Sequence, residues 1–285
     1  MTKQLLAMFL LVIIVCGAPL MVYTSKEEVV FEPDKLVSRA VYLVEQMSHG
    51  TLGTYELGQT EREIAHDLLP FAVRSFGLLL GGVLLAVFIS VIVGLFLQRF
   101  FLARLLQRLL DLLSAIPDFV LVLFSIMLAI QFYKWTQIRI ITLSPNSDAV
   151  NSWFPMAVLA IGPTIFLTKV ISLHYRQISG EDFIKTALAK GLGVWHVLRH
   201  HVWKNILPIV LADLKKTVAI AVSNLFVVEY TLNVVGLTRF IFSKGAPYQF
   251  NAAVMGLMAI ILLSILVYYL VRLLLYVCTR TFVYE

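Results

Sequence analysis

The chain has 285 residues, of which 60% are apolar and 14% are charged, whereas a soluble domain carries roughly a quarter charged residues. The apolar residues form runs long enough to cross a bilayer, which takes about 20 residues per helix, so composition excludes an ordinary soluble domain. The net charge of +6 is explained by basic cytoplasmic loops, because no basic cluster is interleaved with aromatic residues as in a nucleic-acid site.

The first apolar run, residues 1–23, predicts an uncleaved transmembrane anchor. The run is longer than the core of a typical signal peptide, and no small-x-small cleavage pattern precedes a mature start. Cys16 in this run and Cys278 near the C-terminus are expected to be small apolar fillers, because two isolated thiols make neither a disulfide framework nor a metal site.

Residues 24–70 predict a small extracytoplasmic segment. They contain nine acidic and four basic residues, and a net negative segment belongs outside the membrane. Apolar residues at helical spacing over 37–47 predict a helix, and Gly50 and Gly53 predict a turn after it. A short helix is expected to lead to Pro70.

Residues 71–285 contain five further apolar runs and predict a five-helix transmembrane domain. The inner loops are net positive and the large outer segment is net negative, which agrees with six spans and with both termini in the cytoplasm. The expected fold is all-α, a polytopic bundle of about six transmembrane helices in the inner or plasma membrane. The five later spans are placed at about 71–97, 112–132, 153–173, 206–228 and 251–277.

The inner loop 174–206 holds five basic and two acidic residues between two of these spans. Ser179, three residues before Asp182, fits the pattern of a helix N-cap. Gly191 and Gly193 can both adopt the left-handed conformation that ends a helix. The loop therefore predicts a short helix in water at the inner face of the membrane.

A second helix is expected over 195–204, with Pro208 in the first turn of the next span. The apolar Phe183 and Ile184 beside the basic Lys185 fit a groove on a partner protein. The same pattern also fits an amphipathic helix that lies on lipid headgroups, and the residue pattern alone leaves both interpretations open.

The run from Asp182 to Gly191, DFIKTALAKG, resembles the cytoplasmic EAA-type loop of ABC importer permeases. Within that group it is similar to the oligopeptide, dipeptide and nickel permeases, whose loop reads roughly D-Y-V-R-T-A-R-A-K-G-L. Weaker resemblances follow in the family's order over nearly the whole chain. They are HGTLG at 49–53, SAIPDF at 114–119, His201 with Asn205, Leu207 and Pro208, and Val227–Glu229 with Gly236, Leu237 and Arg239.

The chain departs from the family pattern at a few positions. Val235 stands where proline is usual, Thr238 where glycine is usual, and Pro208 comes one residue early. Because of these departures, the sequence does not identify the substrate or the residues of the outer gate. None of the departures lies in the loop motif.

The resemblance implies the permease subunit of an ATP-driven importer for di- or oligopeptides, or else for nickel or other metal chelates. It also implies a second homologous permease, two ATPase subunits docked at the loop and an extracytoplasmic substrate-binding protein. The sequence has no G-x-x-x-x-G-K-[ST] phosphate loop, so ATP and Mg²⁺ belong to the ATPase chains, and this subunit is expected to be non-catalytic and to bind no cofactor. The residues implied in the ATPase contact are Asp182, Phe183, Ile184, Lys185, Thr186, Ala187, Ala189, Lys190 and Gly191.

Asp118, Glu229 and Gly236 are candidates for the translocation path or a gate. Asp118 and Glu229 are candidates because charges within spans are expensive and often functional. Asp118 either faces the path or caps a kink next to Pro117. Glu229 and Gly236 lie in the motif that resembles the family's outer region, and the resemblance favours a gate.

Other polar residues receive plainer interpretations. Asp213 and Lys216 are three apart on a helix and are expected to pair, with Lys215 reaching to the inner interface. The spacing of His196 and His200 can hold a metal. No carboxylate or thiol nearby completes such a site, so a basic face toward headgroups or the ATPase is expected instead.

Three other protein classes fit less well. An intramembrane enzyme would need a motif such as H-E-x-x-H or G-x-S-x-G, and the sequence has neither. A transporter that works without ATP usually has more spans and broken helices in two halves. A sensing or signalling subunit of the same fold remains as an alternative, and neighbouring genes for ATPases and a secreted binding protein would favour the importer.

Overall fold

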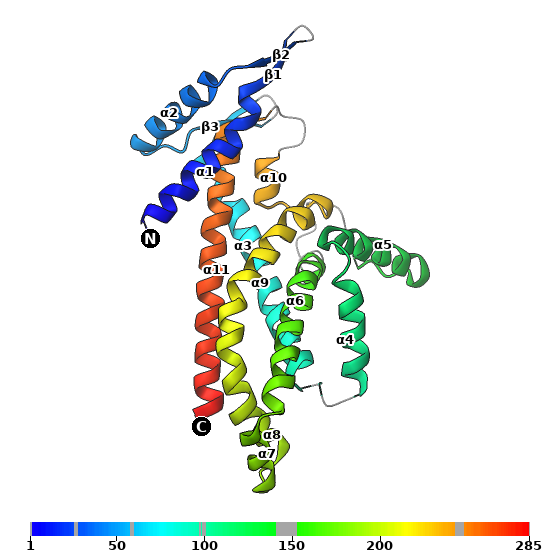
Figure 1. The fold of residues 1–285 in the computed structure, drawn as a ribbon. Coiled ribbons are helices and arrows are strands. Elements are labelled where there is room, and N and C mark those ends of the chain that lie inside the picture. Colours follow the sequence, from blue (N-terminus) through cyan, green and yellow to red (C-terminus); the bar gives the residue numbers. More distant parts are fainter. Residues whose placement is uncertain are drawn as a thin grey trace. The chain divides into compact units, whose positions relative to one another are not determined.

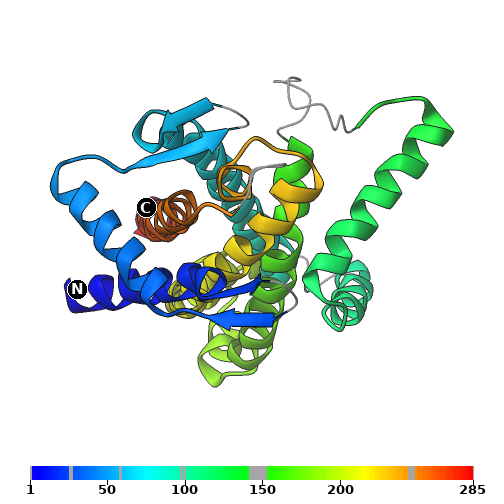
Figure 2. The ribbon, with the colours of Figure 1, turned by 90° about the horizontal axis from the view of Figure 1, so that it is seen from above.

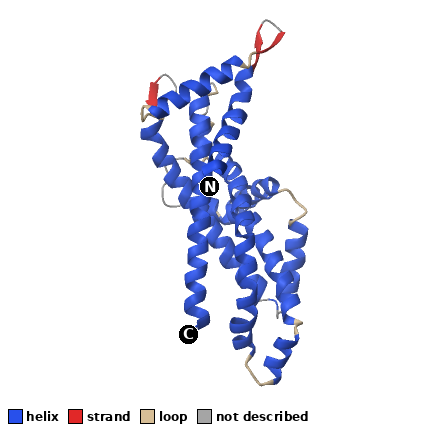
Figure 3. Cartoon of the chain, turned by 60° about the vertical axis from the view of Figure 1, so that its left-hand side comes forward, coloured by secondary structure: helices blue, strands red, loops and turns tan. Residues whose placement is uncertain are grey.

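The structure is a computed structural model that describes residues 2–25, 28–57, 60–96, 98, 101–140, 153–242 and 248–284. Helices dominate, and in the described part strands occur only as two short hairpins (Figure 3). This confirms the predicted all-α class. The chain divides into two compact units, Met1–Ser75 with Val235–Leu263 and Phe76–Val234 with Ser264–Glu285.

The first unit begins with helix α1 (Thr2–Met21), which leads through an antiparallel hairpin of β1 (Val22–Ser25) and β2 (Glu28–Phe31) into α2 (Asp34–Ser48) (Figure 1). Helix α2 contains the predicted helix over 37–47. It packs beside α1 (Figure 2), because Gly17 of α1 leaves the space that a side chain of α2 fills.

The second hairpin pairs β3 (Thr54–Leu57) with β4 (Thr60–Glu63). The predicted turn before it is confirmed, because Gly50 and Gly53 have φ values of +77° and +83°. The hairpins were not predicted from the sequence. All four residues of β4 are exposed, so β4 lacks the alternation of apolar and polar residues that marks a half-buried strand.

Helix α3 (Ile64–Val91) starts directly after β4 and passes through Pro70. The predicted helix that leads to Pro70 is therefore present, but it is not short, because it continues through the proline. A proline inside a membrane-spanning helix is tolerated where neighbouring groups satisfy the freed backbone carbonyl. The first unit also contains α10 (Leu237–Ile241) and the beginning of α11 (Phe250–Tyr284).

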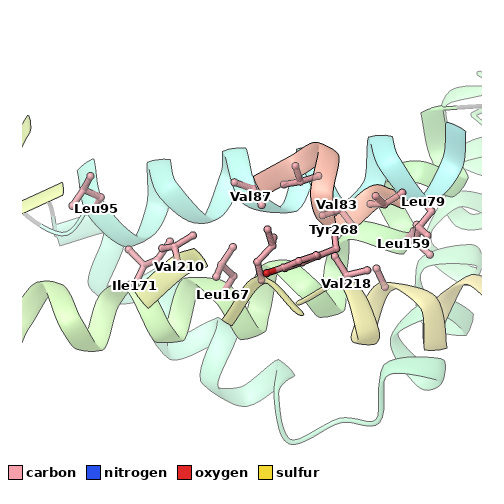
Figure 4. Packing of buried hydrophobic residues seen from close by; sticks show 14 of the residues in the cluster. Leu79, Val83, Val87, Leu95, Leu159, Leu167, Ile171, Val210, Val218 and Tyr268 are labelled. Atoms are coloured by element: carbon pink, nitrogen blue, oxygen red, sulfur yellow. The ribbon is translucent and has the colours of Figure 1, made fainter. Parts of the chain in front are cut away.

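The second unit is a helical bundle with one apolar core (Figure 4). Leu167 of α6, Val218 of α9 and Tyr268 of α11 lie within this core, and α6 and α9 pack along each other. The elements of this unit, besides the later parts of α3 and α11, are the π-helical segment η1 (Ile92–Phe96), α4 (Phe101–Leu113), α5 (Asp118–Thr136), α6 (Trp153–Ser179), α7 (Asp182–Ala189), α8 (Val194–Val197), the π-helical segment η3 (Leu198–Val202) and α9 (Trp203–Thr231).

Four helices of the described part are long and apolar enough to cross a membrane, so the count of six spans is not confirmed. The apolar stretch of α1, Leu6–Met21, is shorter, and α9 is long enough but is interrupted by charged residues. The predicted third span starts too early, because residues 112–116 finish α4 and its turn and Pro117 is the N-cap of α5. The four helices are Ile64–Leu95, Asp118–Thr136, Trp153–Ser179 and Phe250–Arg280.

Candidate functional site

The loop after α6 folds as the short helix α7, which confirms the predicted helix but not its start. Ser179 is the last residue of α6, and Glu181 occupies the N-cap position of α7 without a side-chain hydrogen bond. Tyr175 and Ile178 of α6 still pack against the core. Their burial extends α6 past the point where the capping pattern predicted a new helix.

The C-terminus of α7 is a Schellman motif. The amide of Leu192 donates to the carbonyl of Ala187 at 3.3 Å, and the amide of Gly191 donates to the carbonyl of Leu188 at 3.0 Å. Gly191 has a φ of +79°, as predicted. Gly193 was expected to share this conformation, but its φ is −61° and it occupies the N-cap position of α8.

Helix α7 has a buried side and an exposed side. Ile184 and Ala187 are buried in the core of the second unit, whereas Phe183 is 46% exposed and Leu188 is 44% exposed. Exposed apolar side chains on a short surface helix are available to a partner protein. The exposed members of the predicted contact set are Asp182, Phe183, Lys185, Thr186, Ala189, Lys190 and Gly191.

The polar side chains of α7 interact within the helix. Lys185 Nζ lies 2.9 Å from Asp182 Oδ1, and the Thr186 hydroxyl donates to the carbonyl of Asp182 at 2.8 Å. Both charged groups are exposed, so their pairing contributes little to stability. The ammonium group of Lys185 therefore remains accessible from outside the helix.

The helix predicted over 195–204 is not a separate element, because α8, η3 and α9 follow one another without a break. Leu198, Val202 and Ile206 carry the buried stripe of α9 across the predicted boundary. Pro208 consequently lies inside α9 and not in its first turn. The rings of His196 and His200 stack on this segment with their centroids 4.4 Å apart.

Asp118 lies where α5, α6 and α9 meet. It is the first residue of α5, a position where a carboxylate faces unpaired backbone N–H groups. A methyl group built on Gly162 of α6 would lie 3.1 Å from Asp118 Oδ2 and 2.7 Å from Asn224 Nδ2 of α9. The sequence did not predict this junction, because the three residues are far apart along the chain.

Replacing Gly162 by alanine should destabilise the second unit, because the added methyl group must displace the buried side chain of Asn224 and crowds that of Asp118. Overpacking of this kind costs about 1–3 kcal/mol. Gly77→Ala is the matched control, because a methyl group at Gly77 of α3 meets nothing within 4 Å. Thermal unfolding in detergent should show a lower Tm for Gly162→Ala alone, and equal Tm values for the two variants would contradict this packing.

The two other predicted path residues lie in different units. Glu229 is 1% exposed near the end of α9 in the second unit. Gly236 belongs to the first unit and occupies the N-cap position of α10, and the amide of Leu237 next to it donates to Ser75 Oγ at 2.8 Å. A role of Asp118, Glu229 and Gly236 in transport stays a prediction.

The predicted ion pair of Asp213 and Lys216 was wrong. Lys216 Nζ lies over the ring of Phe166 of α6, 4.6 Å from its centroid, and within the described part of the chain no ion pair joins Asp213 to a basic residue. Because α6 packs along α9, it presents an aromatic face to the lysine, which helical spacing alone could not predict. Lys215 Nζ lies 5.7 Å from the ring centroid of Tyr268.

The contacts of Lys169 of α6 were not predicted from the sequence. Its Nζ donates to Ser114 Oγ at 2.5 Å and lies 3.2 Å from Asp111 Oδ1, so it ties α6 to the end of α4. Asp111 and Lys169 border a cavity of about 310 Å³. A lysine within a predicted span was the available signal, because charged residues are rare there.

Residues 68–276 match the protein family described as binding-protein-dependent transport system inner membrane component. The chain is 24% identical over 194 residues to the dipeptide transport system permease protein DppB of Bacillus subtilis, an alignment that covers 66% of this chain and 61% of that protein. It is 24% identical over 106 residues to the peptide transport system permease protein SapB of Haemophilus influenzae, covering 37% of this chain and 33% of that protein. The chain thus spans less than two thirds of the length of these relatives.

Proposed function

This chain belongs to the family of inner membrane components of binding-protein-dependent transport systems, and on that basis we propose that it is the permease subunit of an ATP-driven importer for di- or oligopeptides. The observation that carries the proposal is α7, a short helix with exposed apolar side chains held between two long helices by a Schellman turn. A partner bound to such a helix can move both long helices. The names of the two relatives support peptides as the substrate, and nickel or other metal chelates are the alternative.

The proposal assigns the remaining parts of the transporter to other chains. A second, homologous permease shares the pore, two ATPase subunits dock on α7, and an extracytoplasmic binding protein delivers the substrate. The sequence contains no phosphate loop, so ATP and Mg²⁺ are assigned to the ATPase subunits, and this chain is non-catalytic and binds no cofactor. Closure of the ATPases moves α7 and rocks the long helices between inward-open and outward-open states, a two-state rigid-body change.

We assign the ATPase contact to the exposed side of α7 and to the turn after it. Phe183 and Leu188 supply apolar surface, and Lys185 and Lys190 supply charge. Ile184 and Ala187 are buried in the chain's own core, so their assigned role is to hold α7 in place. The contact then transmits force because α7 is fixed to the bundle on one side and exposed on the other.

The proposed orientation places both termini and the loop 174–206 in the cytoplasm and residues 24–70 outside an inner or plasma membrane. The charge distribution supports it, because the loop is net positive and the outer segment is net negative. In this orientation Asp118 is assigned to the path near its outer end, because it lies beside Asn224, which precedes Glu229 on α9. Glu229 and Gly236 are assigned to the outer gate.

Reconstitution tests the proposal. An affinity-tagged chain should purify together with ATPase subunits and a second permease. In proteoliposomes the complex should take up a labelled dipeptide only when ATP and the binding protein are both present. Uptake by the isolated chain without ATP would contradict the proposal.

A further inference from the structure

The first unit contains a cavity that no predicted function uses. It has a volume of about 370 Å³ and lies between the end of α1, α2, the hairpin β3–β4 and the beginning of α11. Sites for small molecules usually measure about 300–1,000 Å³, so the cavity has room for a small ligand. In the proposed orientation most of its walls belong to the extracytoplasmic segment.

Opposite charges line this cavity without pairing. Arg39 of α2 borders it, as do Glu56 of β3 and Glu61 of β4. In the described part of the chain, the Arg39 guanidinium and the Glu56 carboxylate make neither an ion pair nor a side-chain hydrogen bond, and Glu61 Oε1 only accepts the hydroxyl of Thr54 at 2.6 Å. A cavity with an unpaired cation and unpaired carboxylates suits a ligand that carries both charges.

The carboxylate wall is held in place by hydrogen bonds. The Glu56 amide donates to Gln249 Oε1 at 2.7 Å, and Gln249 Nε2 donates to the Glu56 carbonyl at 2.6 Å. This amide pair fixes β3 to the residue before α11. Rigid walls lower the entropic cost of binding, because fewer groups must become ordered.

Aromatic side chains and Leu20 form the apolar part of the lining. Tyr42 is 44% exposed and Tyr248 is 42% exposed, so both rings are accessible to a ligand. Tyr55 is buried beneath, with its ring 5.1 Å from that of Phe240 and its hydroxyl donating to Asp67 at 2.6 Å. Burial and the interaction with Asp67 raise the pKa of the Tyr55 hydroxyl to about 12, so this hydroxyl stays protonated at physiological pH.

We propose that this cavity binds a short peptide with free termini, whose carboxylate pairs with Arg39 and whose ammonium group pairs with Glu56 and Glu61. An extended peptide of two or three residues spans about 7–11 Å, and its side chains lie against Tyr42 and Tyr248. This inference rests on the proposed peptide transport and adds a site on the permease itself that selects short peptides by both charged ends.

The test uses the full chain in nanodiscs and three probes: trialanine, its N-acetyl form and its C-terminal amide. Saturation-transfer NMR should show saturable binding of trialanine and at least tenfold weaker binding of each blocked form. The Arg39→Gln variant should bind trialanine no more tightly than it binds the C-terminal amide. The Glu56→Gln variant should lose most of its preference for trialanine over the N-acetyl form. Lys35→Gln is the control on α2, because Lys35 pairs with Glu32 at 3.0 Å and does not line the cavity. This variant should bind trialanine as the wild type does.

Absence of saturable trialanine binding, or equal affinity for the three probes, would overturn the inference. Unchanged preferences in Arg39→Gln and Glu56→Gln would overturn it as well. Both substitutions alter exposed side chains, so folding should survive, and an unchanged Tm verifies this. Peptide uptake by the assembled transporter tests the proposed function separately. If the transporter takes up peptide but the isolated chain binds none, the proposed cavity site is wrong and the proposed function stands.

Discussion

Valine in place of Gly191 should abolish ATP-driven uptake while the chain remains inserted and folded. Gly191 has a φ of +79°, and a β-branched residue adopts this region only under strain. The left-handed conformation costs roughly 1–2 kcal/mol for a residue with a side chain. A side chain at Gly191 meets nothing within 4 Å, so the defect arises in the backbone turn that ends α7. Peptide uptake in proteoliposomes should fall at least tenfold at an unchanged level of protein.

Gly193→Val is the matched control for this substitution. Gly193 lies two residues further on, and a side chain there also meets nothing within 4 Å. Its φ of −61° and ψ of 144° are values that valine adopts without strain. We expect uptake close to that of the wild type, and equal uptake by the two valine variants would contradict the role of the turn.

Aspartate in place of Phe183 should release the ATPase subunits. Phe183 is 46% exposed, so its replacement leaves no cavity in this chain. Loss of an aromatic anchor from an interface typically costs about 2 kcal/mol or more, which corresponds to roughly thirtyfold weaker association. The fraction of ATPase that stays bound to an affinity-tagged chain measures the effect.

Two further variants separate docking from folding. Phe242→Asp changes a phenylalanine that is 53% exposed in the first unit and should leave ATPase binding unchanged. Ile184→Ala removes a side chain that is 4% exposed and should lower the Tm, because truncation of a buried isoleucine costs about 2–5 kcal/mol. Wild-type ATPase binding by Phe183→Asp at an unchanged Tm would place the docking surface elsewhere.

The helix α7 could be predicted because its signals are local. An apolar and basic run that is followed by Gly191 predicts a short helix with a left-handed end, and both features are present. The N-cap could not be predicted in the same way, because the burial of Tyr175 and Ile178 outweighs the preference of Ser179 for a cap. The same competition extends α9 through Pro208, where a buried stripe continues.

Features that depend on distant parts of the chain were not predicted. The junction of Asp118, Gly162 and Asn224 joins three helices, and the contact of Lys216 with Phe166 joins two. The hairpin of β3 and β4 was missed because β4 is exposed on both faces. The count of spans depended on α1, whose apolar stretch is short, and on α9, where charged residues interrupt an otherwise apolar helix. Composition cannot show whether neighbouring helices shield such charges.

The proposed function requires α7 to face the cytoplasm, and cysteine labelling measures on which side of the membrane it lies. Lys185→Cys is placed in a chain whose own thiols, Cys16 and Cys278, are replaced by serine, and a membrane-impermeant maleimide is added to intact cells and to inside-out vesicles. We expect labelling of position 185 only in inside-out vesicles, and labelling of a Lys35→Cys control only in intact cells. Labelling of position 185 in intact cells would contradict the proposed function, because a cytoplasmic ATPase could not then reach α7.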